Sequence, residues 1–555
     1  MNFAHTYREA LQRSAGAWVE ELFQRARHPL EAGKERRFVW PLFTEVPASC
    51  EELNKNASVF TRIPTAMFMA HVLFEQALYN YMNDFGGLYH KTAEVIGRNA
   101  LLEQHQVTAF DPSFLSASMG MNKILTEMSS GAMRASVEYF NEKSSQLLPL
   151  LLSGDMEAVA LFWERQVEIL DIVVNQNPAA MRAIKAEMGC QFDDAKRYVK
   201  ISETPRAILY QVLPLKEGIV MRKSGKPVIH MSPFILPENI IDLLPYRGLS
   251  YVGAFANSGT PTYLLHGKNI WDCIATQMLS EEDLLLDLKF FAEIVHGIHG
   301  HKATINGTCQ GALPLLHGVC CSQLQLDRDV NVWIGTVPAY ALSRSERFQE
   351  NLRMIPKSKQ HLSAITQRLP SGNDVVLGEP ASLSMRLSNF GKENPLSALI
   401  RDMRGAERGK FSPMSAALRH YLETIRPMPL QITAMSQRCA VTPITSEGFF
   451  PGLLFGEPIS LQYAVEKGIT LYVVAGEKDD VVDLPAALAM FDIPCIKEYR
   501  GASAHVIPGA GHVAPMTTCA VEGSKNFIGN SGGPLWFHLN MEAEEMRRKP
   551  RKRST

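Results

Sequence analysis

A cysteine flanked by two glycines lies at the centre of residues 304–313 (TINGTCQGAL). The segment is typical of a strand, a sharp G-x-C-x-G turn and an apolar helix, with Cys309 at the turn. Such a turn leaves no room for a Cβ atom at Gly307 or Gly311, and the helix dipole favours the thiolate of Cys309. A thiolate in this position is a nucleophile for acyl groups. The alternative is a buried cysteine that has glycine neighbours.

An acidic turn and a histidine follow this cysteine along the chain. Residues 473–480 (VVAGEKDD) read as a strand running into an acidic turn, and residues 506–512 (VIPGAGH) as a short apolar run and a glycine-rich loop. Nucleophile, acid and histidine in this order, each at a strand end, are typical of the α/β-hydrolase fold. We therefore predict a catalytic triad of Cys309, Asp479 and His512. The alternative is an acidic helix cap and an ordinary loop histidine.

The elements that must position these residues fall into two halves. Apolar residues recur at helical spacing from about 65 to 201, which predicts a mostly helical N-terminal region at 1–205. From 207 onward, short β-rich runs alternate with longer segments, which predicts a mainly parallel sheet covered by helices in a catalytic domain at 206–540. The predicted strands are 207–213, 218–223, 227–232, 261–267, 303–307, 330–337 and 469–476.

A long gap separates the last two predicted strands. Its length of roughly 130 residues far exceeds what a crossover helix needs. We predict a cap insertion at about 340–465 over the active edge of the sheet, the alternative being a peripheral helical excursion. The N-terminal region, amphipathic at 147–174, is predicted to be a packed helical domain. The alternative for this region is a surface for granules or a partner protein.

Composition excludes several classes of function. The 555 residues include 46% hydrophobic and 20% charged residues with a net charge of -1, so no nucleic-acid partner is expected. Nine cysteines without a C-x-x-C pair fit a reducing cytoplasm. No run reaches the roughly 18 apolar residues of a membrane span, and the first residues lack the apolar core of a signal peptide. The basic segment 541–555 is predicted to be a disordered tail, the alternative being contact with an anionic granule or nucleic acid.

Several of these segments resemble the polyhydroxyalkanoate synthases, which use a G-x-C-x-G elbow with an Asp and a His on an α/β-hydrolase core. Residues 233–243 (PFILPENIIDL) are similar to the proline-rich loop of that family. Residues 259–263 (GTPTY), 472–479 (YVVAGEKD) and 509–514 (GAGHVA) resemble its next strand entry, acid loop and histidine loop. The resemblance covers about residues 220 to 530. Thr308 stands where the family often has an aromatic residue.

The resemblance implies an acyltransferase that polymerises (R)-3-hydroxyacyl-coenzyme A through a thioester on Cys309 and releases coenzyme A. His512 would be the general base, Asp479 would orient it, and the backbone amides of Gln310 and Phe234 would bind the oxyanion. No metal and no bound cofactor would be needed, because the coenzyme A thioester is the substrate.

The expected acceptor is a growing polyester chain. A homodimer, a granule surface and a phasin-like partner are further expectations, and the protein would be cytoplasmic, at polyhydroxyalkanoate granules. Two alternatives stay open. One is a cysteine-dependent thioesterase or esterase of the same superfamily, and the other is a non-catalytic granule-associated protein that keeps the fold.

Two further groups of residues could bind metal or react. His296, His299 and His301 lie in the sequence HGIHGH just before the elbow strand. They have no cysteine or carboxylate at ligand spacing, so we predict a plain loop in the turn before that strand. Cys320 and Cys321 follow the elbow helix on its apolar side and are predicted to be core residues.

Overall fold

The computed structural model describes most of the chain. The described residues are 58–102, 112–346, 348–349, 365–379, 382, 394–409, 413, 417, 425–517 and 532–548. The chain divides into a short unit, Met1–Thr65, and a large unit, Ala66–Thr555, which holds the sheet and the candidate site. Among the helices in the described part of the chain, none is long and apolar enough to cross a membrane.

The described N-terminal region is helical, as the spacing of its apolar residues predicts. Its helices are α3 (Val59–Leu102), α4 (Pro112–Ser153), α5 (Met156–Asp171) and α6 (Asn177–Ile184). Helix α4 ends before Gly154, and Asp155 begins α5 by accepting a hydrogen bond from the amide of Ala158 at 3.0 Å. One small core cluster joins residues of α3 and α5 with helix α15 (Pro395–Glu407) from the insertion.

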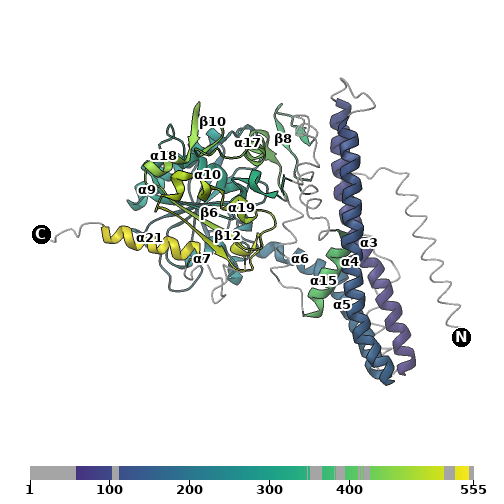
Figure 1. Ribbon diagram of the computed structural model, residues 1–555. Helices are drawn as coiled ribbons and strands as arrows, with labels where there is room; N and C mark the ends of the chain where they lie inside the picture. The colour runs from purple at the N-terminus through teal and green to yellow at the C-terminus, as the bar shows by residue number, and fades with distance from the viewer. Residues whose placement is uncertain are drawn as a thin grey trace. The chain divides into compact units, whose positions relative to one another are not determined.

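The region that follows the helices is built on one eight-stranded sheet in the order β1-β2-β4-β3-β5-β6-β12-β13. Of these strands, β6 and β12 are labelled in Figure 1. Strand β2 is antiparallel to β1 and β4, and every other neighbouring pair is parallel. The strands are β1 (Tyr198–Glu203), β2 (Ala207–Val212), β3 (Val228–Met231), β4 (Thr262–Gly267), β5 (Ala303–Thr308), β6 (Val330–Thr336), β12 (Thr470–Gly476) and β13 (Ala502–Ile507).

Helices cover both faces of the sheet, and each face has its own core. Along β12, Leu471 and Val473 belong to the cluster with helices α9 (Glu281–His299) and α10 (Ala312–Val319), whereas Tyr472 and Val474 belong to the cluster with α7 (Tyr251–Asn257). This period of two is what a strand buried on both faces requires. The α/β-hydrolase-type fold predicted from the sequence is therefore present.

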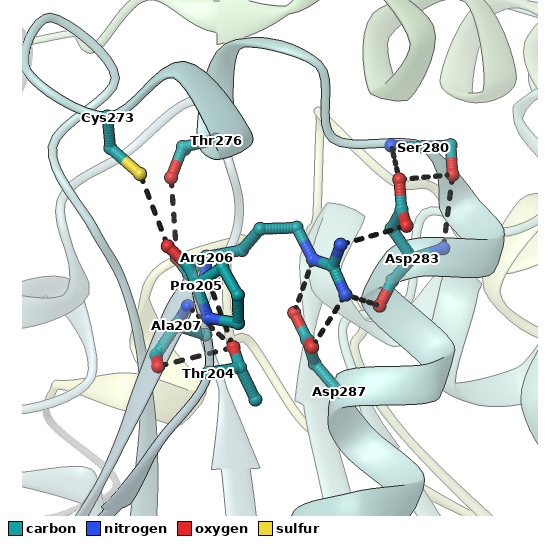
Figure 2. A network of polar contacts seen from close by, with 9 residues as sticks. All are labelled: Thr204, Pro205, Arg206, Ala207, Cys273, Thr276, Ser280, Asp283 and Asp287. Carbon is teal, nitrogen blue, oxygen red and sulfur yellow. Dashed lines mark hydrogen bonds and ion pairs between the residues drawn. The ribbon is translucent and has the colours of Figure 1, made fainter.

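Helix α9 is fixed at its N-terminus by an arginine from the sheet. Figure 2 shows Arg206, just before β2, with its guanidinium between two aspartates of α9. Its Nε donates to Asp287 at 2.8 Å and a terminal nitrogen donates to Asp283 at 2.9 Å. Asp283 also completes a capping box with Ser280, so the first turn of α9 is held from two sides.

Two strand predictions need correction. The sheet starts at Tyr198, inside the range 1–205 predicted to be helical, because β1 pairs antiparallel with β2 across a short turn. Residues 218–223, predicted as a strand, form a turn and an extended loop in which the amide of Arg222 bonds the carbonyl of Gly259 at 3.0 Å. The edge strand β13 was not among the predicted runs, because its apolar residues are mostly small and only Ile507 is buried.

The predicted disordered tail also begins too early. Helix α21 (Pro534–Arg548) continues through residues 541–548. The buried ammonium of Lys226 bonds Glu545 at 2.7 Å, and Arg222 pairs with Glu542 at 2.9 Å. These acidic residues precede the basic run along the chain, and their ion pairs hold the helix to residues that lead into the sheet. The segment 549–555 lies outside the described residues.

The predicted insertion between β6 and β12 contains several described elements. They are η7 (Leu342–Arg344), β7 (Thr366–Arg368), β8 (Asp374–Val376), α15, β9 (Met428–Pro429), α17 (Leu430–Val441), β10 (Phe449–Leu454), β11 (Glu457–Ser460) and α18 (Leu461–Glu466). Ile432 and Met435 of α17 lie in the same buried cluster as Leu313 and Leu316 of α10. The insertion therefore packs on the helix that follows Cys309.

Candidate active site

Cys309 lies in a strained turn at the end of β5. Its φ angle is 51°, in the left-handed region that non-glycine residues rarely adopt. A Cβ atom at Gly307 would lie 2.4 Å from the Cα of Ala312, and one at Gly311 would lie 2.4 Å from the carbonyl oxygen of Ser232. Both flanking positions therefore require glycine, for the steric reason that the motif suggests.

The predicted residues all follow the carboxyl ends of parallel strands. Phe234 comes after β3, Cys309 after β5, Asp479 after β12 and His512 after β13. Strands β3, β5, β6, β12 and β13 run parallel, so these ends share one edge of the sheet. That edge is where open α/β sheets bind ligands.

Asp479 and His512 form a hydrogen-bonded pair. The Nδ1 atom of His512 is 2.8 Å from Oδ2 of Asp479. The other carboxylate oxygen accepts the backbone amides of Val481 and Val482 at 2.9 and 2.8 Å, which fixes its orientation. The Asp479 side chain is fully buried, while that of His512 keeps 15% exposure. The cap of the next helix is Asp483, so Asp479 is not the helix cap.

Charge and hydrogen bonding favour the protonated form of His512. Burial works to lower its pKa, but the charge of Cys309 and the hydrogen bonds that the imidazole makes with Asp479 and Cys309 outweigh burial and raise the pKa to about 10. An imidazolium between a carboxylate and a cysteine sulfur is the partner that stabilises a thiolate nucleophile. The three residues of the predicted triad are thus brought together.

The side chain of Gln310 joins three parts of the site. Its carbonyl oxygen accepts the amide of Ile235, next to Phe234 in the loop after β3, at 3.3 Å. Its amide nitrogen donates to Ser436 of α17 at 2.9 Å. The contact with Ser436 was not predicted, because the two residues lie 126 positions apart and no motif links them. The oxyanion roles of the Gln310 and Phe234 amides remain predictions.

Of the three histidines before the elbow strand, only His301 lies in the predicted turn, between the end of α9 and β5. His296 and His299 form the last turn of α9, which extends to its left-handed cap at Gly300. His296 pairs with Asp329 at 2.8 Å, and His299 bonds the hydroxyl of Tyr263 at 2.7 Å. Within the described residues, no group of three or more potential ligands is placed to hold a metal.

The two adjacent cysteines are core residues, as predicted. Cys320 is 1% exposed and Cys321 is fully buried. Both belong to the cluster under α9 and α10, on the face away from α7.

Comparison with known proteins gives likenesses in structure alone. No family model matches the chain, and no curated protein matches it. A monoglyceride lipase from Saccharomyces cerevisiae is 14% identical with a TM-score of 0.35, covering 63% of this chain and 94% of its own.

Two esterases give similar values. A thermophilic esterase from Thermogutta terrifontis is 13% identical with a TM-score of 0.29, covering 63% of this chain and 98% of its own. Esterase B from Lactobacillus rhamnosis is 10% identical with a TM-score of 0.33, covering 67% and 94%. The fold assignment therefore rests on the sheet and the elbow described above. The likeness to polyhydroxyalkanoate synthases rests only on the sequence segments named in the sequence analysis.

Proposed function

We propose that this protein is an acyl-transfer enzyme of the α/β-hydrolase superfamily that carries its acyl group as a thioester on Cys309. The observation that supports this most strongly is the meeting of a left-handed cysteine elbow with the hydrogen-bonded pair of His512 and Asp479. A non-catalytic protein has no physical need to keep a strained cysteine beside an oriented imidazolium.

The proposed reaction has two balanced halves. In the first, the thiolate of Cys309 attacks the acyl carbon of a coenzyme A thioester, the bond to the coenzyme A sulfur breaks, and His512 protonates the departing thiolate. In the second, His512 removes the proton of an acceptor hydroxyl, the acceptor oxygen attacks the Cys309 thioester, and the thiolate is regenerated. Amides of Gln310 and Phe234 would stabilise both tetrahedral oxyanions.

The choice of a thioester donor follows from sulfur chemistry. Exchange between two thioesters changes the free energy little, because the two thiols are similar nucleophiles and similar leaving groups. The resemblance of four segments to polyhydroxyalkanoate synthases supports (R)-3-hydroxyacyl-coenzyme A as donor and a growing polyester as acceptor. On this proposal the enzyme acts at the surface of its own polymer granule.

A second candidate is hydrolysis of the same thioester, with water as the acceptor. The partial exposure of His512 favours it, because water can approach the imidazole that would deprotonate it. The two candidates share the first half-reaction and differ in the product of the second.

The test is coenzyme A release from (R)-3-hydroxybutyryl-coenzyme A, with identification of the product. Cys309→Ala should abolish release. Cys495→Ala should not affect it. Cys495 lies in α20 (Pro494–Lys497), which precedes β13 and therefore lies near the amino ends of the strands, away from the carboxyl ends that Cys309 follows. Insoluble polyester would support the synthase, and free 3-hydroxybutyrate the thioesterase. Release that persists in Cys309→Ala would overturn both.

A further inference from the structure

A second cysteine, histidine and carboxylate meet in the core of the catalytic region. Cys439 of α17 has its sulfur 3.9 Å from Nε2 of His317 in α10. The Nδ1 atom of His317 is hydrogen-bonded to Glu281, the first residue of α9. The exposed fractions of the three residues are 2%, 0% and 7%, so no substrate can reach this cluster from solvent.

The cluster holds its histidine as a cation. Burial works to lower the pKa of His317, but the charge of Glu281 and the hydrogen bond with Cys439 raise it to about 10. Arg438 also approaches Glu281, at 3.8 Å, and the ring of Phe450 from β10 covers the imidazole with centroids 4.7 Å apart. The imidazolium is thus enclosed by groups from α9, α17 and β10.

The two ends of this cluster differ in how they are anchored. Glu281 lies in the first turn of α9, which the capping box and Arg206 hold to the sheet (Figure 2). Cys439 lies on α17, which belongs to the insertion. His317 therefore connects a helix fixed to the sheet with a helix that the insertion supplies.

Helix α17 contacts the nucleophile segment at a second point. Ser436 lies three residues before Cys439, so both side chains share one face of α17. Ser436 accepts the hydrogen bond from Gln310, the residue after Cys309. The carbonyl oxygen of the same Gln310 side chain accepts a hydrogen bond from the amide of Ile235. Ile235 follows Phe234, whose amide is predicted to bind the oxyanion. A shift of α17 would therefore move Gln310 and loosen that loop.

We propose that His317 is a positioning residue, and that the link from Glu281 through His317 to Cys439 holds α17 where Ser436 fixes Gln310 beside Cys309. This deepens the proposed function by naming what aligns the site. The link touches no reacting atom, so its loss should slow the chemistry and leave substrate affinity nearly unchanged.

The sharpest variants are at Cys439, because they leave the buried ion pair of His317 and Glu281 intact. In the full-length chain, Cys439→Ala should slow alkylation of Cys309 by iodoacetamide by about tenfold, the size of effect that small misplacements cause. Cys439→Ser should restore most of the rate, because serine also hydrogen-bonds the imidazole. The modified Cys309 peptide is quantified by mass spectrometry, which needs no substrate.

The turnover assay gives an independent measurement. Coenzyme A release by Cys439→Ala should show kcat lowered by about the same factor with KM within about twofold of wild type. If Cys439→Ala lowers only the melting temperature and leaves both the alkylation rate and kcat unchanged, the contact of Cys439 with His317 contributes packing alone. That result would overturn the inference.

Failure of the proposed function gives a different pattern. Wild-type protein without Cys309-dependent release would remove the proposed reaction, while a slowed alkylation in Cys439→Ala, rescued by Cys439→Ser, would still support the link. Release that depends on Cys309 but is unaffected by either Cys439 variant would remove the link alone.

Discussion

Two clusters of cysteine, histidine and carboxylate lie in the same domain, and their surroundings separate their roles. Cys309, at the sheet edge, adopts a left-handed φ of 51° and adjoins a histidine with 15% exposure. Cys439 lies inside a regular helix beside a histidine that is fully buried. Both histidines have a pKa raised to about 10.

The contrast shows that these residue types in contact do not define a catalytic site. A nucleophile also needs access for substrate and amides aimed at the developing oxyanion, which the turn after β5 and the loop after β3 can supply. The buried cluster has neither, so its charges can only hold helices together. On our proposals, the same residue types serve reaction at one place and alignment at the other.

The largest expected difference comes from making the same change at both carboxylates. Asp479→Asn should lower kcat for coenzyme A release by roughly 10⁴-fold, because an amide favours the wrong tautomer of His512. Glu281→Gln should lower it by only about tenfold, because that carboxylate acts through α17. Steady-state kinetics of both variants decide the matter. Equal losses would mean that the two clusters do not differ in role.

A matched pair of glycines tests the elbow itself. Gly311→Ala puts a Cβ atom 2.4 Å from a backbone oxygen that cannot move, so we expect a loss of about 3 kcal/mol in the free energy of unfolding and no nucleophile activity. Gly318→Ala, inside α10 and seven positions further on, meets the flexible end of Leu285 at 2.8 Å and should cost less. Urea unfolding measures both. A greater loss from Gly318→Ala would contradict the steric account.

The last prediction concerns pH. The pKa of His512 is raised from 6.5 to about 10, so its protonation contributes stability that is fully present below pH 6.5 and is lost as pH rises through about 10. His317 contributes in the same window and direction. The free energy of unfolding should therefore fall between pH 7 and pH 10, and less steeply in His512→Gln. An equally steep fall in that variant would show that His512 is not protonated in the folded protein.

The sequence was sufficient for the fold class and for the three residues at the sheet edge. Chain order and glycine spacing are local signals, and the fold converts them into proximity because parallel strands end at one edge. Six of the seven predicted runs overlap strands, and the extended loop at 218–223 does not. Its central residues are apolar, but the amide of Arg222 bonds the carbonyl of Gly259, in the loop before β4, and not a strand.

The buried cluster could not be predicted in this way. Glu281, His317 and Cys439 come from three helices, and 122 residues separate the last two. Each one alone fits an ordinary helical pattern, and only packing brings them together. The helical end at 541–548 was missed for a related reason, because the partner of Glu545 is a lysine more than 300 positions away.

The most direct test is to trap the acyl-enzyme. Protein incubated with (R)-3-hydroxybutyryl-coenzyme A is quenched in acid, digested and examined by mass spectrometry for acyl groups on each cysteine peptide. The account predicts an acyl thioester on Cys309 that is absent from Cys439 and is lost in His512→Gln. An unmodified Cys309 in wild-type protein that releases coenzyme A, or an acyl group on Cys439, would contradict it.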